Sequence, residues 1–268
     1  MSRKVLVIVV VYNGMQWLER CLSSVAGSAD LYVWDNDSTD GSADFVATRF
    51  PQAKLVRSAV NLGFSKPNNM GMQYALEHGY DCVYLLNQDA WLAEDTLEKL
   101  LEASEASPDY AVLSPVQMTE GFLAVDKLFQ KDKTPPAAHW LVPVAAIRKL
   151  GLFNEELFPF WGQDDDWCNR ARYFGFKVGV VPEARAVHDR ARRTEDKERL
   201  MSRNYYTGSL VRLCDVNRPL WERFAFVCLF TLVKAVKYRS LRVFALWWRL
   251  CHDLPQVKAC RLRVQRAR

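Results

Sequence analysis

Short apolar runs alternate with amphipathic segments through the first part of the chain. The runs lie at 4–11, 31–34, 54–57 and 82–86. They are rich in β-branched and other strand-forming residues, which is typical of strands buried on both faces of a sheet. The segment 15–25 carries apolar residues at helical spacing. Strands and helices in this order predict an α/β fold with a mostly parallel central sheet and flanking helices.

Polar side chains stand where these runs end. The fourth run stops at 87–89, and the second stops at Asp35, the first residue of an acidic turn. Ligands of open α/β sheets bind at the carboxyl edge of the strands, and a carboxylate there favours a cation or hydrogen-bond donors. A metal-diphosphate site is therefore predicted at this edge. The alternative is turn and helix-capping chemistry for Asp89, before a helix at Glu94, and for residues 38–40.

Three common nucleotide-binding motifs are absent after the first apolar run. The sequence contains no GxGxxG, no GxxxxGK[ST] and no Gly-rich basic loop of the nucleotidyltransferase kind at this place. The corresponding α/β classes are therefore disfavoured.

Four ordered motifs at strand ends carry a family resemblance. They are VVVYNG (9–14), DNDSTDGS (35–42), NLGFSKPNNMG (61–71) and LLNQD (85–89). The chain resembles the large family-2 inverting glycosyltransferases, which have the Rossmann-like GT-A fold. The resemblance covers about residues 4–215, and it implies transfer of a sugar from a nucleotide-diphosphate donor to an acceptor hydroxyl.

The resemblance also implies a metal site. Asp89 ends the family's DxD motif, where a carboxylate holds Mg²⁺ or Mn²⁺ on the donor diphosphate. Asn87 stands where the first Asp usually lies, a pattern of the rhamnosyltransferase-like branch, so one carboxylate would carry most of the metal binding. His188 lies where the family places a metal-binding histidine. The side chains expected at the donor are those of Tyr12, Asn13, Asp35, Lys66, Asn87, Asp89 and Arg190.

The acidic run in FWGQDDDWCNRA (160–171) is the candidate catalytic motif. Helix capping explains one or two of its three aspartates, and mutual repulsion raises the proton affinity of at least one, as a general base requires. In the resemblance Asp164 matches the catalytic base, and Asp166 matches a position that is more often structural. Trp161 and Trp167 are candidates to stack on a sugar, with core packing the alternative for at least one of them.

Length and composition predict one large domain with an appendage. The expected parts are a glycosyltransferase domain at 1–215, with a donor half at 1–118 and an acceptor half at 139–215, and a helical tail at 216–268. A poorly patterned, mobile connection is expected at 119–138. The seven cysteines are scattered without a CxxC pair, and no secretory signal begins the chain, so a reducing cytoplasmic location is expected.

The charge of the chain is concentrated at its end. From Pro219 onward there are 11 Lys/Arg and two acidic residues, a net charge of +9, whereas the preceding residues carry −4. The longest uncharged run of the tail, 224–233, is too short to span a bilayer. Amphipathic helices lying on an anionic membrane surface or forming a homodimer interface are both open, and nucleic acid is the least favoured partner because basic and aromatic residues are interleaved.

The sequence thus predicts a metal-dependent transferase at the inner face of the cytoplasmic membrane. The resemblance suggests dTDP-rhamnose as donor and a bacterial cell-surface glycan or lipid-linked acceptor, such as lipopolysaccharide. Two alternatives remain: a transferase of the same fold that uses a UDP-hexose, and a non-catalytic glycosyltransferase-like partner bound to the membrane.

Overall fold

The structure is a computed structural model, and it describes residues 3–126, 134–135, 137–189, 196–238 and 241–268. These residues form a β-sheet with flanking helices and a helical bundle. The strands are β1 (Val5–Val11), β2 (Asp30–Asn36), β3 (Lys54–Ser58), β4 (Cys82–Asn87), β5 (Ala90–Leu92), β6 (Tyr110–Met118), β7 (His139–Pro143) and β8 (Lys177–His188). The helices are α1 (Met15–Ser23), α2 (Ser42–Arg49), α3 (Ser65–Glu77), α4 (Thr96–Ala106), α5 (Val144–Leu150), α6 (Gln163–Tyr173), α7 (Lys197–Cys214), α8 (Leu220–Tyr238) and α9 (Arg242–Arg266), with a 3-10 turn at Glu120–Phe122.

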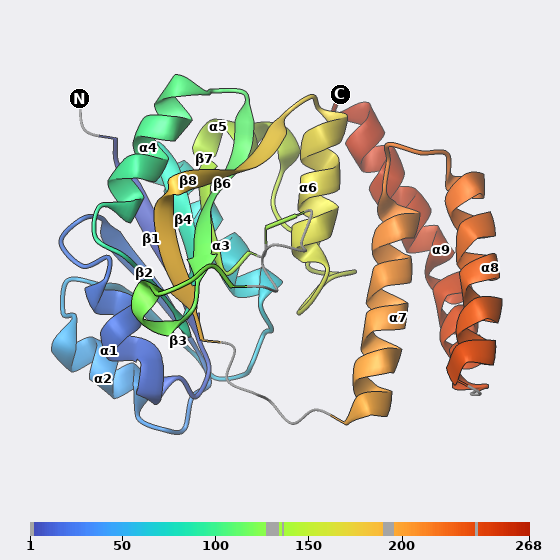
Figure 1. Cartoon of the computed structure of the whole chain (residues 1–268), viewed down its shortest axis with the longest axis horizontal. Coiled ribbons are helices and arrows are strands. Elements are labelled where there is room, and N and C mark those ends of the chain that lie inside the picture. Colours follow the sequence, from blue (N-terminus) through green and yellow to red (C-terminus); the bar gives the residue numbers. More distant parts are fainter. Residues whose placement is uncertain (1–2, 127–133, 136, 190–195, 239–240) are drawn as a thin grey trace.

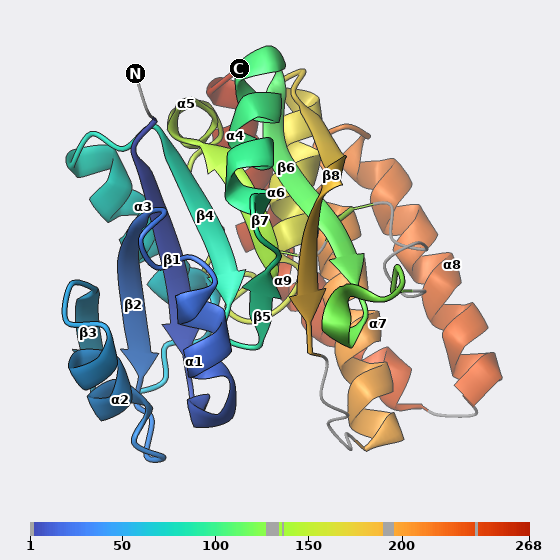
Figure 2. The same ribbon diagram turned by 60° about the vertical axis from the view of Figure 1, so that its left-hand side comes forward.

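The described strands form one sheet in the order β3-β2-β1-β4-β7-β6-β8-β5. β3, β2, β1 and β4 pair in parallel, as do β6 and β8, whereas β7 and β5 run against their neighbours. Six of these eight strands therefore point the same way (Figure 2), which confirms the expected mostly parallel α/β fold. Because β2, β1 and β4 are adjacent, their carboxyl ends meet at one edge of the sheet.

Successive residues of β1 supply the two layers of the core. Val7 and Val9 belong to a cluster with α1, α2 and α4, whereas Leu6 and Ile8 belong to one with α3, α5 and α6. All four are buried. A strand covered on both faces has no polar side, which explains why β1 reads as a continuous apolar run.

A third core holds α7, α8 and α9 together. It includes Phe158 from the loop before α6, so it adjoins the sheet domain. Figure 1 shows the three helices side by side beyond α6, on the far side of the molecule from α1 and α2. The predicted division between residues 215 and 216 stays a prediction, and the packing places α7, before it, in the same core as α8 and α9. Among the described helices none has the length and apolarity needed to cross a bilayer.

The edge of the sheet around β5 and β8 differs from the sequence expectation. β8 continues as far as His188, because it pairs with β6 across a register shift beside Pro115. The short strand β5 was not anticipated, and it pairs antiparallel with the end of β8. α4 begins at Thr96, with Asp95 at its N-cap, so Asp89 does not cap that helix.

Candidate functional site

The side chain of Gln88 joins the carboxyl ends of β1 and β4. Its Oε1 accepts a hydrogen bond from the Tyr12 N–H at 2.8 Å, and its Nε2 donates one to the Tyr12 carbonyl at 3.1 Å. Gly14 leaves room for this contact, since a Cβ there would lie 2.3 Å from Gln88 Oε1. Sequence reasoning assigned no role to Gln88 or Gly14, and the one signal for Gln88 is that it is a polar residue directly after β4. The pair fixes the backbone that borders the predicted donor site.

The loops after β1 and β2 hold each other through turn chemistry. Asn13, at φ 47°, donates its N–H to Ser38 Oγ at 3.0 Å and accepts one hydrogen bond from the Thr39 N–H at 2.9 Å. Asp40 accepts one from the Met15 N–H at 3.0 Å. Ser38, Thr39 and Asp40 therefore have the turn-stabilising role that the sequence predicts for them.

Two buried oxygen atoms at this edge have no hydrogen-bond partner among the described residues. They are Asp35 Oδ1 and Asn87 Oδ1. Asp35 uses its other oxygen to accept the Ser38 N–H at 3.2 Å. Buried polar atoms are normally paired, so unpaired acceptors at a ligand-binding edge are suited to the donors of a ligand.

Asp89 and His188 come together because β5 pairs with β8. The register places Ala90 opposite His188, and the imidazole Nε2 lies 3.3 Å from the Asp89 carboxylate. Both side chains are partly buried, and His188 Nδ1 has no partner among the described residues. A carboxylate oxygen beside an imidazole nitrogen fits a divalent cation of the Mg²⁺ or Mn²⁺ kind. Arg190, the predicted basic neighbour, lies outside the described residues.

Lys66 is exposed in the first turn of α3. The loop before it is fastened by Asn36, whose Nδ2 donates to the Gly63 carbonyl and whose Oδ1 accepts the Leu62 N–H, each at 2.8 Å. Asn36 is a second positioning residue that the sequence reasoning did not single out. It fixes the loop that presents Lys66 at the same edge.

Asp164 lies in the first turn of α6, just after Gly162. Burial, and secondly the charge of Asp165, raises the pKa of Asp164 to about 6, while hydrogen bonds from the backbone, including that of Ala137, partly oppose the rise. The sequence predicted such a rise from mutual repulsion, and burial is the larger cause. A carboxyl group with this pKa is ionised at neutral pH and still basic enough to take a proton from a hydroxyl.

Two adjacent residues before β7 connect Asp164 to the strand edge. The backbone of Ala137 hydrogen-bonds the Asp164 carboxylate, and the carbonyl of Ala138 accepts the Asn87 N–H at 2.9 Å. Because consecutive Cα atoms are about 3.8 Å apart, Asp164 and the end of β4 lie on either side of a single short segment. The predicted base and the predicted donor edge therefore border one region.

The first half of the chain has the sequence pattern of a known family. The family model described as glycosyl transferase family 2 matches residues 6–139, half of the chain. The chain belongs to glycosyl transferase family 2. It is therefore a glycosyltransferase, as the motifs at the strand ends predicted.

Named relatives of this glycosyltransferase are distant. The low-salt glycan biosynthesis hexosyltransferase Agl10 of Haloferax volcanii is 24% identical over 68% of this chain and 66% of its own length. The dTDP-rhamnosyl transferase RfbF of Shigella flexneri is 22% identical over 70% of each chain. The N-acetylglucosaminyl-diphospho-decaprenol L-rhamnosyltransferase of Mycobacterium tuberculosis is 22% identical over 81% of this chain and 86% of its own.

Solved structures share the fold. The mannosyltransferase PcManGT from Pyrobaculum calidifontis, solved in complex with GDP-Man and Mn²⁺, superposes with a TM-score of 0.63 at 17% identity, covering 100% of this chain and 86% of its own. This likeness supports the GT-A fold that the strand-end motifs predicted.

Asp166 has a structural role in the glycosyltransferase. Its carboxylate lies 3.0 Å from Arg170 Nε in a buried ion pair. Arg170 also donates to the carbonyls of Leu150 and Leu152, at 2.7 and 3.0 Å. Arg170 therefore connects α6 to the end of α5, and Asp166 holds Arg170 in place.

A group of three possible metal ligands among the described residues lies elsewhere, at the junction of α6, α7 and α9. Its members, Asp166, Cys214 and Cys260, bring their ligand atoms within 4.8 Å of one another. Asp166 is engaged by Arg170, and Cys260 accepts a hydrogen bond from Asn154 at 3.2 Å. These partners give the cluster a structural explanation.

The two tryptophans of the candidate catalytic motif have different surroundings. Trp167 is 1% exposed, and its Nε1 donates to the Gly151 carbonyl at 2.9 Å, so it belongs to the core. Trp161 is 50% exposed. Of the two, Trp161 alone is accessible to a sugar.

Proposed function

We propose that the protein is an inverting, metal-dependent glycosyltransferase that moves rhamnose from dTDP-rhamnose to a hydroxyl of a bacterial cell-surface glycan or lipid-linked acceptor such as lipopolysaccharide. The observation that carries this proposal is Asp164, a carboxyl group with a pKa of about 6 beside the polar strand edge. The names of the Shigella and Mycobacterium relatives, and Asn87 in place of the first Asp of the DxD motif, favour rhamnose.

The reaction follows from the placement of one base. Asp164 takes the proton of the acceptor hydroxyl as its oxygen attacks the anomeric carbon of the donor sugar. A new bond forms between that carbon and the acceptor oxygen, and the bond from the carbon to the diphosphate breaks, with its electron pair leaving on the nucleoside diphosphate. Attack from the face opposite the leaving group inverts the configuration.

The strand edge is the proposed donor site. Tyr12, Asn13, Asp35 and Lys66 border the nucleotide, and the unpaired oxygen of Asp35 accepts a hydrogen bond from it. Asp89 and His188 would hold Mg²⁺ or Mn²⁺, and such a cation, when bound, supplies positive charge to the donor diphosphate.

Nucleotide titration tests this proposal. Calorimetry with dTDP and with UDP, each with and without Mn²⁺, should show metal-dependent nucleotide binding by the full chain. Asp89→Ala should abolish this binding, because Asp89 is the one carboxylate of the Asn-Gln-Asp turn. Asp44→Asn is the matched control, since Asp44 of α2 is exposed and forms an ion pair with Arg57 of β3. Metal-dependent binding that survives in Asp89→Ala would place the metal elsewhere.

A UDP-hexose is the second candidate donor, because the Haloferax relative is named a hexosyltransferase. Turnover with dTDP-rhamnose, UDP-glucose and UDP-N-acetylglucosamine distinguishes the two. A non-catalytic role would be supported if no nucleotide binds with metal present.

We further propose that the protein lies on the inner face of the cytoplasmic membrane. Four aliphatic side chains of α8 at helical spacing are more than half exposed: Leu229, Leu232, Val233 and Val236. We call them the α8 apolar face. The net charge of +9 after residue 218 complements anionic lipid. A homodimer through the same face is the alternative.

A further inference from the structure

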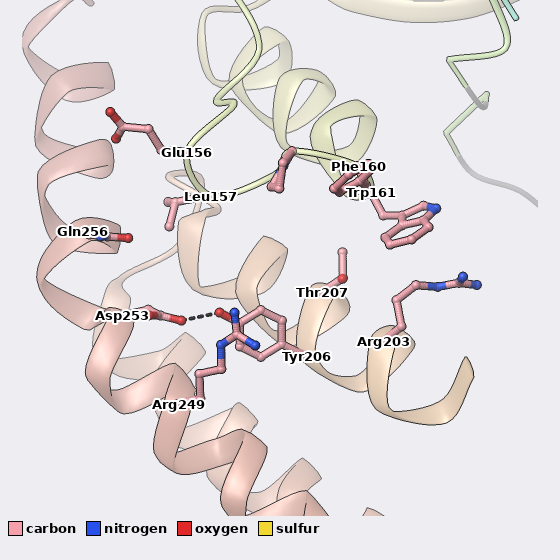
Figure 3. Close-up of a pocket in the computed structure, with 11 residues that line it drawn as sticks. Glu156, Leu157, Phe160, Trp161, Arg203, Tyr206, Thr207, Arg249, Asp253 and Gln256 are labelled. Atoms are coloured by element: carbon pink, nitrogen blue, oxygen red, sulfur yellow. Dashed lines mark hydrogen bonds between the residues drawn. The ribbon is translucent and has the colours of Figure 1, made fainter. Parts of the chain in front are cut away.

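A pocket lies between part of the loop before α6 and the helical bundle. It has a volume of about 320 Å³, and it is lined by residues of the loop before α6 and of the helices α7 and α9. Figure 3 shows Trp161 and Arg203 at one end, Tyr206 and Arg249 in the middle, and Gln256 towards the other end. A volume of this size falls at the lower end of the range for small-molecule sites, roughly 300–1,000 Å³.

Aromatic rings and planar polar groups are interleaved along this pocket. The Arg203 guanidinium lies 4.5 Å from the centre of the Trp161 ring, and that of Arg249 lies 4.6 Å from the centre of the Tyr206 ring. The Tyr206 hydroxyl donates a hydrogen bond to Asp253. Ring faces are thus held at set positions beside hydrogen-bonding groups.

The charges of the lining residues balance. Arg203 and Arg249 are offset by Glu156 and Asp253. A pocket built for a phosphate or another anion would carry an excess of basic groups, and this one does not. The balance favours a neutral ligand that has both hydroxyl groups and an apolar face.

Trp161, in the lining of the pocket, precedes the proposed base Asp164 by three residues. Gly162, between them, packs directly on α7, since a Cβ there would lie 2.7 Å from Thr207 Cγ2. On the other side the Pro159 carbonyl accepts the Phe64 N–H at 2.8 Å, which ties the loop to the nucleotide edge. The loop therefore contacts the residues before α3 on one side, and it contributes Trp161 to the pocket on the other.

We propose that this pocket binds a neutral pyranose ring of the acceptor, next to the sugar that receives the transferred residue. A pyranose presents a face of C–H groups that packs on an aromatic ring, and a rim of hydroxyls that pair with guanidinium, carboxylate and amide groups. Trp161, which is 50% exposed and has Arg203 over one side of its ring, supplies the aromatic surface, and Arg249, Asp253 and Gln256 supply partners for the rim. The acceptor is then an oligosaccharide. This inference rests on the proposed function.

An oligosaccharide array tests the inference on the full chain with dTDP and Mn²⁺ present. The array carries neutral bacterial oligosaccharides and the same sugars bearing a terminal phosphate. Neutral sugars should bind, and Trp161→Ala should weaken binding about tenfold or more, since it removes one aromatic face. Trp161→Phe should restore part of the affinity. Trp248→Ala, at a 72% exposed tryptophan outside the pocket, should bind as the wild type does.

Nucleotide titration of the same preparations separates the two proposals. If nucleotide binds and no neutral saccharide does, or if Trp161→Ala binds saccharides as the wild type does, the pocket proposal is wrong and the transferase proposal stands. Binding of phosphorylated sugars alone would also overturn the pocket proposal. If Trp161→Ala fails to bind nucleotide, Gln256→Ala, at an exposed side chain of the lining, takes its place with the same expected loss of saccharide binding.

Discussion

Three adjacent aspartates in α6 have three different environments, although the sequence presents them as one acidic run. Asp164 is partly buried with a raised pKa, Asp165 is exposed, and Asp166 is buried in an ion pair with Arg170. Helical geometry turns each successive side chain by about a third of a turn, so neighbours in sequence face different surroundings. Of the three, Asp164 is the proposed base.

We expect Asp164→Asn to bind the donor nucleotide nearly as the wild type does and to lose roughly a hundredfold or more in turnover, the usual contribution of a general base. The amide keeps the size and polarity of the carboxyl group, but it cannot accept a proton at neutral pH. Steady-state rates at pH 7.5 and nucleotide titration check the two parts. Asp165→Asn is the matched control, and it should retain most of the turnover.

Asp166→Asn serves as the contrasting variant. It breaks a buried ion pair, so its main effect should be a lower Tm. If it keeps its Tm and loses more turnover than Asp164→Asn, the base has been assigned to the wrong residue.

The pH profile should follow the state of Asp164. A base acts only when ionised, and burial raises the pKa of this carboxyl group to about 6, so turnover should fall as pH drops through about 6. The charge of Asp165 also raises this pKa. Asp165→Asn should therefore move the acid limb of the kcat profile to lower pH. An unmoved limb, or a limb that shifts upward, would mean that another group controls it.

At the scale of elements, the loop before α6 depends on a close approach to α7. Gly162 has φ 88°, and a Cβ on it would lie 2.7 Å from Thr207 and 2.9 Å from Val211. Gly175 has nearly the same φ, 86°, with open space around it. The two glycines therefore separate backbone strain from crowding.

We expect Gly162→Ala to lower the free energy of unfolding more than Gly175→Ala does. Strain at positive φ costs about 1–3 kcal/mol at both sites, and crowding against α7 adds to it at Gly162 alone. Thermal unfolding of the two variants measures the difference. Equal losses would show that α7 moves aside without cost.

The sequence predicted the strands that are long and apolar and missed the contacts that depend on tertiary pairing. β1 and β4 were found because burial on both faces leaves a continuous apolar pattern. β5 has three residues, too few for a pattern, yet its pairing with β8 brings Asp89 to His188. The family resemblance, and not periodicity, named those two residues together. The roles of Gln88 and Asn36 lie in hydrogen bonds across the sheet edge, which no local pattern encodes.

At the scale of the whole molecule, the strongly basic end of the sequence is folded into the helical bundle. Arg261 of α9 is buried, and it donates to the carbonyls of Leu213 and Arg218 at 3.0 and 2.6 Å. At least one basic side chain of this end, Arg261, therefore connects α9 to the end of α7 and the loop after it. Deleting residues 216–268 would expose the core of α7, so membrane binding is better tested by substitutions at the surface.

We expect the triple variant Leu229→Glu, Val233→Glu, Val236→Glu to lose most of its binding to vesicles of phosphatidylglycerol and phosphatidylethanolamine. The three side chains are 62%, 54% and 79% exposed on the α8 apolar face, so the glutamates meet solvent in the free protein and meet like charge and apolar lipid at the membrane. Raising salt from about 0.1 to 1 M should weaken wild-type binding too, because it shortens the Debye length from about 10 to 3 Å. Val60→Glu with Leu123→Glu, at exposed apolar positions outside the bundle, is the control and should bind as the wild type does.

Vesicle flotation measures binding to the membrane, and sedimentation equilibrium measures association between copies of the chain. Salt-resistant flotation, or unchanged flotation of the triple variant, would contradict membrane docking, and loss of a dimer in that variant would assign the face to a second copy of the chain.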